Sequence, residues 1–324
     1  ECNKKGIAVI LDMVYNHFWP EWNYFHDYWP YFSNHYKTPW WNAINYDGSY
    51  SYWVRNFFLQ NVKYFLNLLD VDILRLDAVH EIYDTREKHL LKEMSELVKQ
   101  ISIDSWKKKQ LIAESDMWDT NNYKLLNKEE SGWYEIDWQW CDDFHHVVST
   151  YLSWEKIWNY EKYEWNLDWA KKLLSEWFLY SWQNWWDKEN YTWKKTSNLP
   201  WNKFITYMQN HDQIWNRMLW ERFNIITDEK KSLFSSVLLL LSTNITMLFM
   251  WEEYAEENTF LYFVSFSIPE LIKAIREWRK KEFKIFNWDW ESPNPECQEV
   301  FYKSKLDWDL LQKPEKQKYF EMYK

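Results

Sequence analysis

The segment VDILRLDAVH, residues 71–80, is a short apolar run that ends in charged and polar side chains. It predicts a buried parallel β-strand over residues 71–76. Alternate residues of a strand point to the same face, so we expect Arg75 and Asp77 on one face and Leu76 on the other. A guanidinium beside a carboxylate keeps the carboxylate ionised, as a catalytic nucleophile requires. Taken alone, the pair could equally be a structural ion pair.

Short apolar runs alternate with longer helical patterns through most of the chain. The apolar runs predict strands at residues 8–14, 71–76, 111–113, 204–208 and 245–250. The helical patterns cover residues 52–69, 85–101, 145–152, 229–241 and 269–281. Such alternation is typical of βα units and therefore predicts an α/β fold with parallel strands. The polar and aromatic segment 17–51 predicts a long functional loop.

Three other segments also place polar side chains at or beyond the end of a predicted strand, which is where barrels of parallel strands carry their active sites. They are DMVYNH (12–17), IAESD (112–116) and QNHDQ (209–213). By itself, His17 could be an ordinary loop residue, and Glu114 could neighbour a helix N-cap. Together the segments supply the two carboxyl groups that glycoside hydrolysis needs, one ionised and one protonated.

DMVYNH, RLDAVH, the Glu of IAESD and the NHD of MQNHDQ resemble, in the same order, the four sequence regions of the α-amylase family of glycoside hydrolases. The resemblance implies a TIM (β/α)₈ barrel in which Asp77 is the nucleophile, Glu114 the acid/base and Asp212 the transition-state stabiliser. It also implies contacts to sugar hydroxyls and to the nucleophile, and residues that support the site. The contacts are Arg75, His17 and His211, and the supporting residues are Asp12 and Asn16.

QWCDDFHH (139–146) and NHDQIWNR (210–217) narrow the resemblance within the family. They are similar to members that cleave the α-1,4 bond next to the terminal trehalose of maltooligosyl trehalose. The further substrate contacts that this implies are His80, Asp142, His145, Gln213 and Asn216. The alternatives are a branching enzyme, an α-amylase, or a non-catalytic glycan-binding subunit. The last should lack at least one catalytic carboxylate, and all three are present. Ile73 departs from the small residue usual in the family.

The composition agrees with a sugar substrate. The formal net charge of −10 disfavours a nucleic-acid partner, and no apolar run approaches the roughly 18 residues of a membrane span. The three cysteines are far apart, without metal-ligand spacing. We therefore expect no metal, no cofactor and no membrane contact. We see no signal peptide, and expect a cytoplasmic enzyme acting on maltooligosyl trehalose or another α-glucan oligosaccharide.

Glycine and tryptophan counts are abnormal. The chain has 3 Gly and 28 Trp, whereas about 7% of residues are normally Gly. Several tryptophans occupy sites where turns favour Gly: Trp19, Trp29, Trp185, Trp186 and Trp193. Our hypothesis is that most of these tryptophans, with Trp215 among them, are glycines encoded by UGA and read as Trp. A protein rich in Trp platforms for sugars would not explain the missing glycines.

The resemblance begins at the third strand of the barrel. We therefore expect residues 1–288 to form a partial catalytic barrel, without the first two βα units and the flanking N-terminal β-domain. Residues 289–324 are expected to be an exit segment toward an absent C-terminal β-domain.

Overall fold

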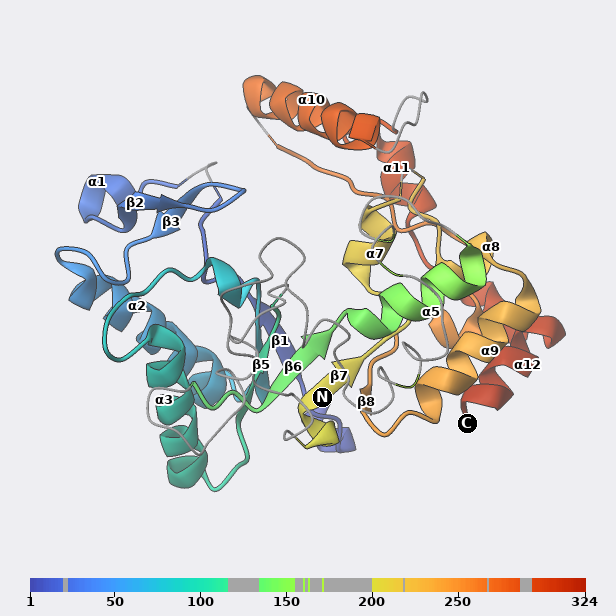
Figure 1. Ribbon diagram of the computed structural model, residues 1–324, viewed down its shortest axis with the longest axis horizontal. Helices are drawn as coiled ribbons and strands as arrows, with labels where there is room; N and C mark the ends of the chain where they lie inside the picture. The colour runs from blue at the N-terminus through green and yellow to red at the C-terminus, as the bar shows by residue number, and fades with distance from the viewer. Residues whose placement is uncertain are drawn as a thin grey trace. The chain divides into compact units, whose positions relative to one another are not determined.

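The computed structural model describes residues 1–19, 23–115, 134–154, 160, 163, 171, 200–217, 219–266, 268–285 and 293–324. These residues fall into two compact units (Figure 1). Unit 1 comprises residues 1–140 and 180–205, and unit 2 comprises residues 141–179 and 206–324. Three of the tryptophans at sites that favour glycine, Trp185, Trp186 and Trp193, lie outside the described residues, as does Asp116 of the IAESD segment.

Unit 1 is built on a parallel sheet in which β1 pairs with β4, β4 with β5 and β5 with β6. Three of its strands were predicted and are present: β1 (Ile10–Met13) and β4 (Ile73–Leu76), both shorter than predicted, and β5 (Gln110–Ala113), one residue longer. The sequence did not predict β6 (Trp138–Cys141). The α/β class with parallel strands is therefore confirmed.

Two helices of unit 1 lie side by side next to the sheet (Figure 1): α2 (Ser51–Lys63), continued by a π-helical turn (Tyr64–Leu68), and α3 (Leu90–Ser105). Their apolar positions recur at helical spacing, so one face of each helix is buried. The buried side chains are Val54, Phe58, Val62, Leu66, Leu90, Leu91, Met94 and Val98. The predicted loop 17–51 contains helix α1 (Phe25–Tyr28) and the antiparallel strands β2 (Phe32–Lys37) and β3 (Asn42–Ile44).

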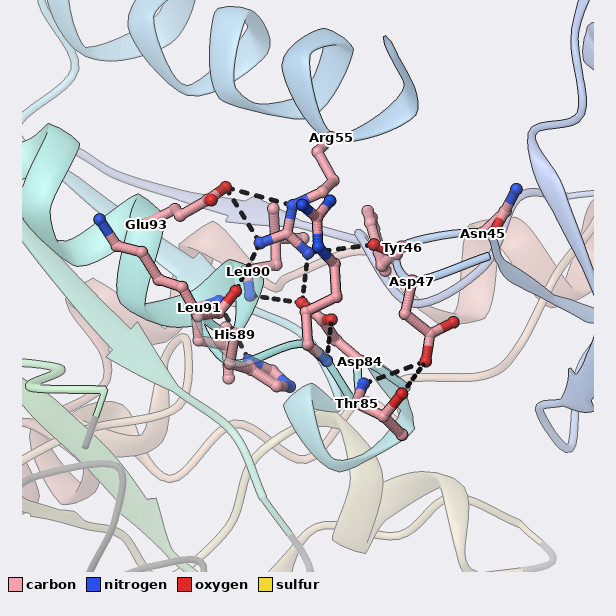
Figure 2. Close-up of polar contacts among 12 residues, drawn as sticks. Asn45, Tyr46, Asp47, Arg55, Asp84, Thr85, His89, Leu90, Leu91 and Glu93 are labelled. Atoms are coloured by element: carbon pink, nitrogen blue, oxygen red, sulfur yellow. Dashed lines mark hydrogen bonds and ion pairs between the residues drawn. The ribbon is translucent and has the colours of Figure 1, made fainter. Parts of the chain in front are cut away.

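Arg55 on α2 fixes the chain that follows β4 (Figure 2). Its guanidinium pairs with the buried carboxylate of Asp84, donates to the carbonyl oxygens of Tyr46 (3.1 Å) and Lys88 (2.8 Å), and pairs with Glu93 at 3.0 Å. Asp84 also accepts a hydrogen bond from the N–H of Leu90, the first residue of α3, at 2.7 Å. One buried cation therefore anchors the segment between the end of β4 and the start of α3.

Unit 2 carries the remaining predicted helices. The helices among its described residues are α5 (Asp143–Ser153), α7 (His211–Trp215), α8 (Phe223–Ile226), α9 (Glu229–Leu240), α10 (Pro269–Ile285), α11 (Gln298–Lys303) and α12 (Pro314–Tyr323). Strand β7 (Phe204–Thr206) ends at its boundary, and the N–H of Met247, next to β8 (Ile245–Thr246), donates to the carbonyl oxygen of Thr206 at 2.9 Å. A core cluster contains Ile214, Trp220, Phe249, Leu261 and Val300.

No helix in the described part of the chain is both long and apolar enough to span a bilayer. Four described tryptophans, Trp106, Trp154, Trp220 and Trp251, have φ between 53° and 63°. This left-handed region favours glycine and strains a side chain, which supports the glycine hypothesis at these positions. Trp29, in contrast, has an extended backbone (φ −164°) that any residue adopts, so its geometry gives that hypothesis no support.

Candidate active site

The register of the sheet in unit 1 brings Asp77 and Glu114 together. Leu76 of β4 is level with Ala113 of β5, so the next residue of each strand leaves the same edge of the sheet. Backbone bonds continue past that edge: the N–H of Glu114 donates to the carbonyl oxygen of Leu76, and that of Asp77 to Met13, both at 3.0 Å. The two predicted catalytic carboxylates therefore lie at adjacent strand ends, as the strand pattern predicts.

Arg75 contacts three carboxylates. Its Nη1 donates to Asp77 Oδ1 (2.6 Å) and Asp12 Oδ1 (2.7 Å), and its Nη2 lies 2.7 Å from Glu114 Oε2. The side chain is 3% exposed. Burial lowers the pKa of the guanidinium, but the carboxylates of Glu114, Asp12 and Asp77 raise it by more. Arg75 is thus a permanent positive charge between the two predicted catalytic groups.

The indole of Trp140, on β6, covers the guanidinium of Arg75, with the ring centroid 4.1 Å from Cζ. Cation–π contact of this kind stabilises a desolvated cation. The sequence did not single out Trp140, because the excess of tryptophans in the chain gave no reason to choose this one.

Asn16 holds the other side of Asp77. The buried Asn16 amide donates to Asp77 Oδ2 (3.1 Å) and to the Asp77 carbonyl oxygen (2.8 Å). His17 Nδ1 bonds the amide oxygen of Asn16, and its ring stacks on Trp40 at 5.0 Å between centroids. Burial lowers the pKa of His17, against the carboxylates of Asp77 and Glu81, which raise it. Asp77 is therefore fixed by Arg75 on one oxygen and Asn16 on the other.

A backbone donor fixes Glu114. The N–H of Ala78 donates to Glu114 Oε2 at 2.9 Å, from a residue with φ 37° and ψ 57°. This left-handed turn directs the chain into a short 3₁₀ helix, Val79–Glu81, which carries the partly buried His80. Sequence reasoning missed this donor, because side-chain patterns carry no signal for a backbone N–H.

In unit 2, a capping box holds the segment with His211 and Asp212. Asn210 Oδ1 accepts from the N–H of Asp212, and Gln213 Oε1 accepts from the N–H of Asn210, both at 2.8 Å. Such reciprocal bonds stabilise the first turn of a helix. His211 and Asp212 lie on this turn of α7, with the Asp212 side chain 41% exposed and 3.4 Å from His211 Nε2. Asn216 ends the helix.

Asp142 and His145 lie at the start of α5, also in unit 2. Asp142 accepts from Gln213 Nε2 at 3.5 Å and from the hydroxyl of Tyr207. His145 is buried: Nδ1 bonds the carbonyl oxygen of Met208, and Nε2 bonds the Tyr160 hydroxyl at 2.7 Å. Burial lowers the pKa of His145 to about 4. Both ring nitrogens of His145 therefore bond within the protein, and its role as a substrate contact stays a prediction.

The predicted site residues thus gather in two groups. Those in unit 1 are Asp12, Asn16, His17, Arg75, Asp77, His80 and Glu114, and those in unit 2 are Asp142, His145, His211, Asp212, Gln213 and Asn216. Within the described ranges, no group of three or more His, Cys, Asp or Glu side chains is arranged to hold a metal ion.

Comparison with known proteins gives consistent relatives. The chain is 40% identical to the malto-oligosyltrehalose trehalohydrolase of Saccharolobus solfataricus, in an alignment that covers 96% of this chain and 52% of that protein. It is 35% identical to the protein of the same name from Rhizobium sp. (strain M-11), with 98% of this chain and 53% of that protein covered. The chain therefore spans about half the length of the curated relatives it matches. No family model matches the chain.

Solved structures agree with this result. A protein of Salmonella typhimurium designated a candidate α-amylase superimposes with a TM-score of 0.89 and 29% identity, over 99% of this chain and 54% of that one. A pullulanase of Anoxybacillus sp. LM18-11 superimposes with a TM-score of 0.58 at 16% identity, over 99% of this chain and 40% of that one, which shows a shared fold alone. The chain is therefore similar, over nearly its whole length, to about half the length of these malto-oligosyltrehalose trehalohydrolases, and to a solved structure designated a candidate α-amylase.

Proposed function

We propose that the polypeptide carrying this chain is a retaining glycoside hydrolase that cleaves the α-1,4 bond next to the terminal trehalose of maltooligosyl trehalose. The observation that carries the proposal is the contact of one buried guanidinium, that of Arg75, with both Asp77 and Glu114. Two carboxyl groups bound to one guanidinium are close together, and retaining enzymes need a separation of only about 5–5.5 Å. We infer the substrate from the names of the relatives.

In this mechanism Glu114 protonates the glycosidic oxygen while Asp77 attacks the anomeric carbon and forms a glycosyl-enzyme. Water activated by the ionised Glu114 then cleaves that intermediate. Asn16 and Arg75 orient Asp77 for attack, each by a hydrogen bond to a different carboxylate oxygen. Asp212 stabilises the oxocarbenium-like charge. The products are trehalose and a shorter maltooligosaccharide.

The test measures trehalose release from maltooligosyl trehalose, with plain maltooligosaccharides of equal length as the comparison. We expect rapid release of trehalose and little attack on the plain chains. The second candidate is an α-amylase, which the designation of the Salmonella typhimurium relative favours. Equal hydrolysis of both substrates would support that candidate, and longer, branched products would support a branching enzyme.

We also propose that this chain is an internal part of the barrel, from its third strand onward, and that the enzyme is cytoplasmic. Apolar side chains at and beside β1 support the first point, since Ile7, Ile10 and Val14 are 57%, 53% and 46% exposed. The free thiols of Cys2, Cys141 and Cys297 suit a reducing compartment. The gene itself tests the first point, because its flanking codons must encode the preceding strands. The same gene must read UGA at Trp106 and Trp154, and UGG there would end the glycine hypothesis.

A further inference from the structure

A buried polar side chain stands directly before the segment that carries His211 and Asp212. Gln209 is 3% exposed, and both ends of its amide are engaged. Its Oε1 accepts from the N–H of Phe223 at 2.9 Å, and its Nε2 donates to Glu252 Oε2 at 3.3 Å. The next residue, Asn210, is the N-cap of α7. The position of Gln209 therefore sets where the first turn of α7 begins.

Glu252, in the 3₁₀ helix Glu252–Tyr254, receives donors from three directions. Its Oε2 accepts from Gln209 Nε2 and from the N–H of Phe249 (3.2 Å), and its Oε1 accepts from the Tyr323 hydroxyl (3.3 Å). Although part of the residue reaches the surface, these donors enclose its carboxyl group. An ionised carboxylate is acceptor-only and suits such a set of donors, whereas a protonated carboxyl would turn its own O–H toward one of them.

The groups that face Glu252 come from several elements. Tyr323 is on α12, and its hydroxyl also bonds Ser236 Oγ of α9 at 2.7 Å. The buried guanidinium of Arg222, before α8, favours the ionised form of Glu252. Burial nevertheless raises the pKa of Glu252 to about 7, against the lowering effects of Phe249, Gln209, Tyr323 and Arg222. The protonation state of this carboxyl group therefore changes near neutral pH.

We propose that Glu252 is a positioning residue for the reaction: through Gln209 it holds the first turn of α7, and with it His211 and Asp212, in the geometry that catalysis needs. The proposal rests on the proposed function. Glu252 need not touch substrate. It acts by accepting the hydrogen bond from Gln209 Nε2, while Gln209 Oε1 accepts from the N–H of Phe223, so the residue that precedes the N-cap of α7 is held at both ends of its amide.

The test compares Gln209→Leu, Glu252→Leu and the double variant in the complete polypeptide. Each single change removes the same link, so each should lower kcat for maltooligosyl trehalose on the order of 100-fold, the effect of an ångström-scale misplacement of a catalytic group. KM should change much less. The double variant should be no slower than either single variant, because residues in one network are not additive. Independent, multiplying losses would overturn the proposal.

Glu252→Gln mimics the protonated carboxyl group. It keeps one oxygen but turns an NH₂ toward the other donors and cannot ionise, so its kcat should match the low-pH value of the unmodified enzyme and should not change with pH near 7. In the unmodified enzyme kcat should fall as pH drops below about 7 and Glu252 takes up a proton. Glu253→Gln, a change at the adjacent residue, is the control and should leave kcat and its pH profile unchanged. A kcat in Glu252→Gln that still changes with pH near 7 as in the unmodified enzyme would refute the assignment.

Amide hydrogen exchange makes the test independent of the substrate assignment. The N–H groups of Asn210 and Asp212 should exchange faster in Glu252→Leu than in the unmodified protein, while those of α9 stay unchanged. An unmodified enzyme that cleaves no maltooligosyl trehalose would overturn the proposed function alone. Unaltered exchange at Asn210 and Asp212 would overturn the positioning role, whatever the activity.

Discussion

Asp77 and Glu114 contact one guanidinium, and the proposed mechanism requires them to act in different protonation states. Asp77→Asn removes the proposed nucleophile, and Glu114→Gln removes the proposed proton donor while keeping an acceptor for the Ala78 N–H. We expect each change to lower kcat by about 10³-fold or more. The measurement is trehalose release under saturating substrate, with exposed Asp104→Asn on α3 as the control. Turnover within a factor of two of the unmodified enzyme in either variant would remove that residue from the mechanism.

Backbone conformation at single residues makes a prediction about the tryptophans. Trp106 ends α3 with φ 56° and is 95% exposed, so it has little packing to lose. Glycine is the usual residue at such a helix end. Trp106→Gly should therefore raise the free energy of unfolding by about 1 kcal/mol. The check is urea unfolding of the complete polypeptide.

The control is the same substitution inside a helix. Trp53 is exposed on α2, where the backbone is helical. There glycine costs conformational entropy, so Trp53→Gly should lower the free energy of unfolding by about 1 kcal/mol. Shifts of the same sign at both positions would contradict the reading of Trp106 as a misplaced glycine.

Among elements, those with strong periodicity were predictable and those shaped by tertiary contacts were not. Residues 229–241 were predicted as a helix, and α9 covers Glu229–Leu240. The helix predicted from residue 85 begins instead at Leu90, because Asp84 takes the N–H groups of Arg86 and Leu90. Sequence patterns cannot show that a buried Arg55 holds Asp84 in place for this purpose.

The candidate site was predictable to a similar degree. Parallel register alone brings Asp77 beside Glu114, since consecutive strands end at one edge. The partners that fix them are the Ala78 N–H and the Trp140 indole, and they depend on backbone dihedrals and on a strand that the sequence did not indicate. Strand β6 was missed because only the first three of its residues, WQWC, alternate between apolar and polar side chains, which is too short a run to indicate a strand.

The Arg55 network predicts how two elements hold together. Arg55→Met leaves the buried Asp84 carboxylate without its cation, so we expect the free energy of unfolding to fall by about 3–5 kcal/mol. Arg86→Met, at an exposed position nearby, should change it by less than about 0.5 kcal/mol. Urea unfolding gives both values. Equally small changes in the free energy of unfolding for both variants would mean that water, rather than Arg55, stabilises the charge of the Asp84 carboxylate.

The contact between α5 and the end of β7 predicts a pH dependence. His145 is 3% exposed, and burial lowers its pKa from 6.5 to about 4. Between these values the unfolded chain binds a proton that the folded protein does not. Stability is therefore present above about pH 6.5 and is lost as pH falls toward 4, by about 3 kcal/mol from this group.

His145→Gln removes that titration, so its free energy of unfolding should fall less steeply between pH 6.5 and 4 than that of the unmodified protein. Urea unfolding at several pH values measures the slope. His26→Gln, at a side chain that is 63% exposed, is the control and should leave the slope unchanged. Parallel curves for the His145 variant and the unmodified protein would show that another group causes the loss.

For the whole molecule, strand β1 determines whether residues 1–324 are soluble and active when expressed alone. β1 pairs with β4 on one side, and Ile7 and Ile10 are more than half exposed. An unpaired apolar edge promotes aggregation. Expressed alone, residues 1–324 should be insoluble or inactive, whereas the complete polypeptide should be monodisperse and active. Size-exclusion chromatography and trehalose release measure the two properties, and a monodisperse, fully active 324-residue chain would show that β1 needs no further strand.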